Sequence, residues 1–258
     1  MIPSPVFGSK RQSASGGYTG DGMILAAHQL HYLPWLRYFH KIASSDTFVV
    51  LDNIQFNKNG WQNRNKIKTP QGAATLTVPV HQRFQQSLAQ VRIDTKQPWR
   101  RKQWKAMELH YGRTPYFKDH ADFFKGVFET EWEHLNDLNY KIFFYLLKAL
   151  TIQTRIVKSS DLSLKGEATE RLVGICKELG ARRYLTGAYA VQVYLNPQLF
   201  KEEGIELLFQ EFDCPLYPQL YPQAGFISEL SVIDLLFNCG PKSLEILTQT
   251  ASKTAGGK

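Results

Sequence analysis

Chemically versatile side chains are concentrated in one short segment, residues 28–35, whose sequence is HQLHYLPW. Its two imidazoles can exchange protons or contact phosphates near neutral pH, and an amide, a phenol and an indole accompany them. An apolar run precedes the segment at 24–27, and an amphipathic stretch follows it at 36–43. A buried strand that leads through a polar turn into a helix is where α/β proteins place ligands, so we predict a site here.

Within this segment His28 is the first candidate catalytic residue, because it stands where the strand should end. We expect it to act as a base or as a phosphate contact. For His31 we favour a position in the core beside Trp35, with its hydrogen bonds satisfied, over contact with a ligand. Gln29, Tyr32 and Trp35 are predicted to bind substrate.

A second segment begins at Asp52, directly after the apolar run 47–51. If the two runs form neighbouring parallel strands, Asp52 approaches His28 and orients it, or binds a hydroxyl or a metal-bound water. The alternative is an Asx turn that simply leaves the strand. Gln55, three residues on, is predicted to contact substrate.

A third segment, residues 60–66, surrounds a tryptophan and an arginine with amides. The guanidinium of Arg64 can clamp a phosphate or carboxylate, with Lys66 and Asn63 beside it. Trp61 can stack on a base or a sugar and, together with Tyr32, would form a stacking wall. The alternative is an exposed polar loop.

Three later residues complete the candidate site. Gly187 follows a predicted strand and can open a helix whose N-terminus binds an anion, although one glycine is weak evidence. Tyr194 and Tyr217 are predicted to contact substrate as well.

Several kinds of chemistry find no support in the sequence. There is no serine in a nucleophile elbow, no dinucleotide-binding glycine motif and no phosphate-binding P-loop motif. Zinc binding by the two histidines and Asp52 lacks a third firm ligand, so we predict no metal, and no cofactor is indicated. Three scattered cysteines, Cys176, Cys214 and Cys239, favour a reducing cytoplasmic compartment.

The charge distribution favours a phosphate-bearing partner. The formal net charge is +8 over 258 residues, and the excess is local. Residues 53–70 carry four cations without an acid, and residues 91–106 carry six against Asp94 alone. Such clusters are typical of proteins that bind a nucleotide, a sugar nucleotide or RNA, although a solvated basic face is the alternative for any single lysine.

The order of apolar and amphipathic segments predicts an α/β fold, a Rossmann-like parallel-sheet domain with a helical insertion and a β-hairpin. A strand, a helix and a strand follow one another within residues 23–51, with the helix expected over Tyr32 to Ser44. The hairpin is expected around 69–72, and the insertion over about 98–150. Four further elements are expected in the second half: a helix over 168–179, and strands over 154–158, 183–186 and 205–209.

The ends of the chain are expected to lie outside the fold. Residues 1–22 are rich in glycine and serine and read as a disordered extension, and residues 249–258 as a flexible tail. Residues 23–248 then form a single domain. No apolar run approaches the roughly 20 residues that a membrane helix needs, so no membrane insertion is expected.

Several of these motifs together resemble the WbqC-like family of bacterial proteins. The resemblance extends from Met23 to about Leu247, with Leu30 standing where the family usually has proline. It rests on HQxxYLPW at 28–35, YFxKI at 38–42, DxxQF at 52–56, WQNRNxIK at 61–68, YGxxPYF at 111–117, Gly187, YL at 194–195, YPQ at 217–219 and DxxFNxGP at 234–241.

The resemblance implies a biosynthetic enzyme, as in surface-polysaccharide or specialised-metabolite pathways, that transfers an acyl or aminoacyl group onto an amino sugar. The first strand–helix–strand unit also resembles that of HIGH-type nucleotidyltransferases, in which histidines of the first turn hold phosphates. That likeness is one of fold.

Three functions are therefore compared. The first is a cytoplasmic transferase whose small substrate carries a phosphate or carboxylate, for example a nucleotide-linked sugar; a tRNA is a further candidate partner. The second is a nucleotidyltransferase that uses a nucleoside triphosphate. The third is a non-catalytic RNA-binding module, whose affinity would fall steeply with salt.

Overall fold

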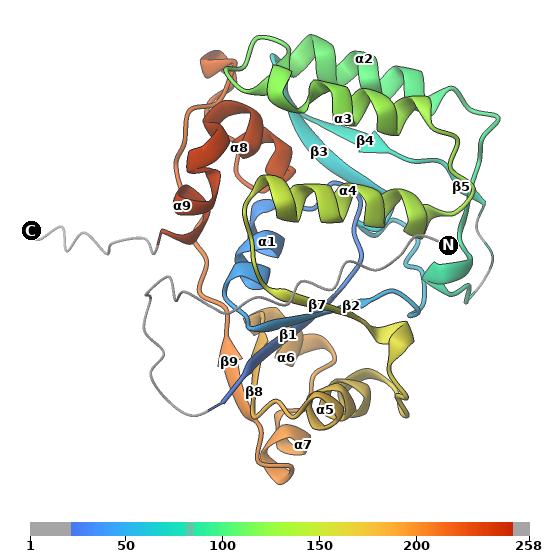
Figure 1. Cartoon of the computed structure of the whole chain (residues 1–258), viewed down its shortest axis with the longest axis vertical. Helices are drawn as coiled ribbons and strands as arrows, with labels where there is room; N and C mark the ends of the chain where they lie inside the picture. Colours follow the sequence, from blue (N-terminus) through green and yellow to red (C-terminus); the bar gives the residue numbers. More distant parts are fainter. Residues whose placement is uncertain (1–21, 82, 84, 250–258) are drawn as a thin grey trace, which may run out of the picture.

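A five-stranded parallel sheet forms the centre of the structure, a computed structural model that describes residues 22–249 except 82 and 84 (Figure 1). Apolar residues occupy most positions of its strands, because both faces are covered by helices. The predicted α/β class is confirmed. The strands, in spatial order, are β7 (Arg155–Lys158), β2 (Thr47–Leu51), β1 (Ile24–Gln29), β8 (Arg183–Thr186) and β9 (Glu206–Phe209).

The chain builds this sheet outward from β1 in two directions. It passes from β1 to β2 and β7 on one side, and then crosses to β8 and β9 on the other. The strand order therefore reverses between β1 and β8, and ligands of such sheets bind beyond the carboxyl ends of the strands at this point. Ala26 pairs with Leu185, so His28 and Gly187, each two residues farther on, lie at the same end of the sheet.

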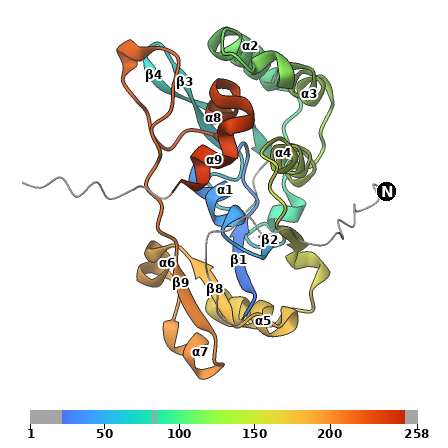
Figure 2. The same ribbon diagram turned by 60° about the vertical axis from the view of Figure 1, so that its left-hand side comes forward.

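Alternate residues of β1 point to the two faces of the sheet. Ala26 packs against the helices of one face, and Leu25 and Ala27 pack against those of the other. Figures 1 and 2 show the two layers on either side of the sheet. The first comprises α1 (Leu36–Ala43), α4 (Leu135–Ala149), α8 (Val232–Cys239) and α9 (Ser243–Thr248), and the second comprises α5 (Ala168–Leu179), α6 (Ala188–Val193) and α7 (Pro197–Glu202).

The segment between β2 and β7 contains the predicted hairpin and helical insertion, and both are confirmed. The hairpin is antiparallel and turns at 70–71. Aromatic residues of the insertion pack mainly on one another and on α8, as core residues. The elements are β3 (Arg64–Thr69), β4 (Gly72–Thr77), β5 (Val80–His81), β6 (Arg92–Ile93), α2 (Trp99–Tyr111), α3 (Phe117–Glu129) and α4.

The first helix begins later than the sequence pattern predicts. α1 starts at Leu36 rather than at Tyr32, with Trp35 as its N-cap. The reason is local, since Leu33 has a φ of 44°, a left-handed conformation that interrupts a helix. Of the expected disordered extension (1–22) and flexible tail (249–258), residues 1–21 and 250–258 lie outside the described residues. In the described part, no helix has the length and apolar character needed to cross a bilayer.

A buried polar network joins the hairpin to the loop after β9. Lys68 Nζ donates to Gln219 Oε1 at 2.9 Å and to the carbonyl of Gly225 at 2.6 Å. Nearby, the hydroxyl of Tyr217 donates to Asp234 at 2.8 Å. Lys68 is 1% exposed and Asp234 is 0% exposed. Because burial opposes ionisation, the pKa of Asp234 is raised to about 6 and the pKa of Lys68 is lowered.

Gly240 ends α8 in a conformation that a side chain would disturb. Its φ is +52°, and a Cβ atom there would lie 2.4 Å from the ring of Tyr116. We expect Gly240→Ala to lower the free energy of unfolding by about 2 kcal/mol, through strain and overlap. Gly126, at an exposed position of α3, is the matched control, because a Cβ atom there would meet nothing within 4 Å. Gly126→Ala should stabilise by roughly 0.5 kcal/mol in urea unfolding, and equal effects of the two substitutions would contradict this account.

Candidate functional site

Two histidines and a tyrosine form a compact ring cluster at the carboxyl end of β1. The ring centroids of His28 and His31 lie 4.7 Å apart, and the ring of Tyr38 on α1 lies 5.1 Å from His28 and 5.5 Å from His31. Tyr38 donates its hydroxyl to the carbonyl of Gln29 at 3.0 Å. His31 and Tyr38 are buried and His28 is partly buried, so the cluster is accessible chiefly through His28.

Lys41 adds a buried cation behind this cluster. It lies on the same helix as Tyr38, three residues later, and is 9% exposed. Its ammonium makes no hydrogen bond or ion pair with any residue that the structure describes. Arg37, one turn earlier, adds a second positive charge that is paired at the surface with Glu229. His31 Nδ1 is also buried without a described partner.

The pKa values of these groups follow from burial and from their shared positive charge. Burial and, to a smaller extent, the charge of Lys41 lower the pKa of His28 to about 3, and a backbone contact with Gln29 opposes the shift. The pKa of His31 is lowered well below its usual value by burial, His28 and Lys41. Burial and Arg37 lower the pKa of Lys41 to about 8. Both imidazoles are therefore neutral near pH 7, whereas Lys41 is mostly charged and close to its titration range.

The third predicted segment lies directly against this end of β1. The indole rings of Trp35 and Trp61 meet edge to face with centroids 5.3 Å apart. Gln62 Nε2 donates to Gln29 Oε1 at 3.0 Å, and Lys66 Nζ lies 5.5 Å from the ring of Trp61. Trp35 and Trp61 are both partly exposed, so they form an aromatic edge beside the histidines. These residues lie beyond the carboxyl ends of β1 and β8, the position at which parallel sheets bind ligands, and for that position alone we call the group His28, His31, Lys41, Trp35 and Trp61 the crevice.

Other residues of the predicted site have structural partners. Tyr32 is fully buried and donates to Gln103 Oε1 at 2.6 Å, so its ring packs in the core rather than lining an open surface. Asn63 is buried and donates to the carbonyl of Val78. Arg64 is partly exposed and donates to the carbonyl of Asn59. Gln55 is exposed in the same region.

Asp52 is held by two serines that follow the neighbouring strand β7 and by Tyr140 of α4. Its Oδ1 accepts from Ser159 Oγ and the amide of Ser160, both at 3.0 Å. Its Oδ2 accepts from Tyr140 Oη at 2.9 Å and Ser160 Oγ at 2.8 Å. No hydrogen bond joins Asp52 to His28 among the described residues. The carboxylate ties β2 to the segment after β7 and to α4.

The remaining predicted residues lie in three places. Gly187 is the N-cap of α6, at the carboxyl end of β8 beside β1. Tyr194, at the end of α6, is 55% exposed and accepts at its carbonyl from Thr169. Tyr217 belongs to the buried network with Asp234. The structure therefore brings His28, Gln29, Trp35, Trp61 and Lys66 together, with Gly187 at the same end of the sheet, but not Asp52 or Tyr217.

Sequence reasoning did not select Lys41 as a site residue. A signal was present, since Lys41 stands three residues after Tyr38 and directly before Ile42, which places it on the inward side of the helix. No local sequence pattern predicts that none of the described carboxylates pairs with the ammonium of Lys41. Among the described residues no group of three or more histidine, cysteine, aspartate or glutamate side chains is arranged to hold a metal ion.

The fold defines a Rossmann-like α/β protein, and the candidate site at its topological switch point contains Lys41, whose ammonium pairs with no described carboxylate. A profile of the WbqC-like protein family matches residues 29–246, and the chain belongs to this family. The uncharacterized protein Rv1507c of Mycobacterium tuberculosis is 34% identical over 227 residues, which cover 86% of this chain and 96% of that protein. No solved structure matches the chain.

Proposed function

We propose that the chain is a biosynthetic transferase whose crevice holds the anionic group of its substrate, a phosphate or a carboxylate. Two observations near His28 carry this proposal: Nδ1 of His31 is buried without a described partner, and Lys41, which is 9% exposed, has no hydrogen bond or ion pair at its ammonium among the described residues. A buried cation without an acid is costly unless an anion joins it. The position beyond β1, beside β8, supports the same conclusion.

The pKa values suggest distinct roles for these residues. With a pKa of about 3, His28 is a weak base and serves better as a hydrogen-bond donor to the substrate. A bound anion would raise the pKa values of His28 and Lys41, because it offsets the positive charge around them. Trp61 and Trp35 would hold a sugar or another planar part of the substrate, with Arg64 and Lys66 facing an anionic donor.

Acyl transfer onto an amino sugar is the reaction class that we propose, consistent with the family's biosynthetic character. The sugar amine attacks the carbonyl carbon of a thioester, a carbon–nitrogen bond forms, and the thiol leaves with a proton. Asp52, through its network, is proposed as a residue that keeps the end of β2 in place for this reaction.

The test is turnover with defined donors and acceptors, followed by mass spectrometry. The full chain is incubated with acyl-coenzyme A or aminoacyl-tRNA donors and nucleotide-linked sugars that carry a free amine. We expect a product with the added acyl mass, and a loss of roughly 100-fold in kcat/KM for His28→Ala. His81→Ala, at an exposed histidine of β5, is the matched control and should retain turnover. Full turnover by His28→Ala with a productive pair would refute the assignment.

Nucleotidyl transfer is the second candidate, and one observation favours it. His28 and His31 are three residues apart at the end of the first strand of a Rossmann-like sheet, with their rings 4.7 Å apart. Two neutral imidazoles so placed can donate hydrogen bonds to the phosphates of a nucleoside triphosphate. This candidate requires nucleotide binding that depends on His28.

A further inference from the structure

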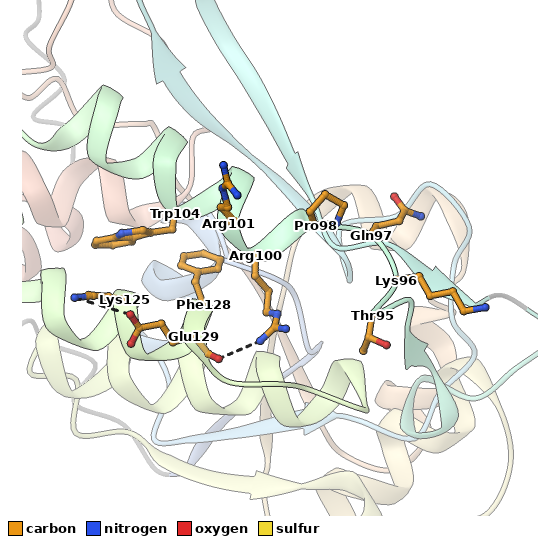
Figure 3. Close-up of a pocket in the computed structure, with 10 residues that line it drawn as sticks. All are labelled: Thr95, Lys96, Gln97, Pro98, Arg100, Arg101, Trp104, Lys125, Phe128 and Glu129. Atoms are coloured by element: carbon orange, nitrogen blue, oxygen red, sulfur yellow. Dashed lines mark hydrogen bonds and ion pairs between the residues drawn. The ribbon is translucent and has the colours of Figure 1, made fainter.

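A second basic site lies outside the crevice, where α2 begins and α3 ends. A cavity of about 460 Å³ opens there, and none of the crevice residues lines it (Figure 3). Its wall includes residues of the loop before α2, the first turns of α2 and the last turns of α3. This region contains much of the basic cluster 91–106 that the sequence singles out and that the crevice does not use.

The lining of this cavity is strongly cationic. It includes four cations, Lys96, Arg100, Arg101 and Lys125, and one carboxylate, Glu129. Lys125 lies 3.9 Å from that carboxylate. Arg100 donates to the carbonyl of Glu129 at 3.0 Å and to a glutamate beyond the cavity. The side chains of Lys96 and Arg101 have neither a hydrogen bond nor an ion pair within the described part of the chain, so they are free to meet an anion.

The start of α2 adds to this field. The helix has 13 residues, no side chain caps its N-terminus, and its first turn contains no acid. Its first amide groups therefore lack side-chain acceptors at an end that attracts anions. Lys96 precedes this end of α2 and Arg101 lies in its first turn, so backbone and side chains both make this wall of the cavity positive.

An aromatic surface completes the cavity. Trp104 is partly exposed and is held in place by Phe117, stacked at 6.0 Å, and by Phe128 at 6.4 Å. Figure 3 shows the rings of Trp104 and Phe128 side by side, with Lys125 close to them. A ring fixed beside several cations suits a ligand that combines a planar base with phosphate, because bases stack on aromatic faces.

We infer that this cavity binds a nucleoside phosphate, with the phosphate on Lys96, Arg101 and the start of α2 and the base against Trp104. The site is separate from the crevice and does not depend on its proposed function. The ligand is either a free nucleotide or the end of an RNA strand, which share this chemistry.

Isothermal titration of the full chain tests the inference. ADP at low salt should bind at least roughly tenfold more tightly than adenosine or inorganic phosphate, since each fragment lacks one half of the contacts. The double variant Lys96→Glu/Arg101→Glu should lose roughly tenfold or more in ADP affinity. Arg113→Glu/Lys118→Glu reverses two exposed cations that do not line the cavity and should change it less than about twofold.

The base contact is tested separately by Trp104→Leu, which should lose roughly tenfold in ADP affinity while leaving phosphate binding unchanged. If that variant fails to fold, the charge-reversed pair still decides, because Lys96 and Arg101 are exposed. A short RNA oligonucleotide that displaces ADP and is weakened by the same charge reversal identifies RNA as the source. An oligonucleotide that cannot displace ADP identifies a free nucleotide.

Three results would overturn the inference. They are no ADP binding at millimolar concentration, equal affinity in the charge-reversed pair and its control, or equal affinity for ADP and phosphate. Binding that is lost in His28→Ala but kept in Lys96→Glu/Arg101→Glu would also overturn it. That result would assign the nucleotide to the crevice and support nucleotidyl transfer.

Discussion

Lys68→Met is expected to destabilise the fold by about 3 kcal/mol, because it removes the donor from a buried network. Lys68 Nζ is the shared donor for Gln219 Oε1 and the carbonyl of Gly225. Methionine fills the same space but leaves both oxygens and the Asp234 carboxylate without their cation. The loop after β9 is then held less tightly against the hairpin, since Lys68 comes from β3.

Lys66→Met is the control for this prediction. Lys66 lies two residues earlier on the same face of β3, but it is partly exposed and its ammonium lies over the ring of Trp61 rather than in a buried hydrogen-bond network. Urea unfolding at pH 7 should show a change within about 0.5 kcal/mol for this variant. If Lys68→Met and Lys66→Met unfolded at the same urea concentration, the network would contribute nothing measurable to the fold.

Lys41→Met should have the opposite sign and raise the free energy of unfolding by about 2 kcal/mol at pH 7. Unlike Lys68, Lys41 has no described acceptor or carboxylate, so no group of the described protein compensates its burial. An apolar side chain of similar length removes that cost. The same substitution should weaken binding of the substrate's anionic group by roughly tenfold or more, because the charge is lost.

The pH dependence of the stabilisation by Lys41→Met gives a second test of the buried ammonium. Burial, with Arg37, lowers the pKa of Lys41 from 10.5 to about 8, so between these pH values the unfolded chain holds more protons than the folded one. The contribution of Lys41 to the free energy of unfolding of the parent protein therefore rises with pH across this window, and its cost is complete below pH 8. The gain from Lys41→Met should shrink steadily as pH rises from 8 towards 10.

Urea unfolding of both proteins at pH 7.0, 8.0, 9.0 and 9.5 measures this difference. Taking the difference cancels tyrosines and cysteines that titrate in the same range but are common to both proteins. A Lys41→Met variant less stable than the parent at pH 7, or a gain independent of pH, would show that the ammonium has a compensating partner. The crevice would then lose its main support as an anion site.

The contrast between these two lysines shows where sequence reasoning succeeds and where it stops. The strands over 47–51 and 183–186 and the helix over 168–179 are predictable, because each is a local pattern of apolar spacing and end signals. The start of α1 is not, since the left-handed Leu33 carries no marker such as glycine. Both lysines read as ordinary basic residues, and their burial depends on distant segments.

The candidate site divides in the same way. His28 at the end of β1 follows from the apolar run before it, and its position beside the switch point is consistent with that prediction. The partners of Asp52 do not follow, because Ser159 and Ser160 stand more than 100 residues later in the chain. Parallel neighbours bring strand ends to one edge, but side-chain direction and later segments decide which groups meet.

Taken by itself, the sequence determines the α/β class, the parallel pairing of the first two strands, the hairpin and the concentration of reactive side chains in residues 28–35. These depend on interactions between residues close in the chain. Only the tertiary structure decides that Lys41 is buried with no described carboxylate beside it, that Lys68 is buried with acceptors, and that a basic cavity opens between α2 and α3. Burial and pairing depend on segments that meet across the fold. They determine whether a buried charge stabilises the protein or destabilises it until an anionic ligand binds.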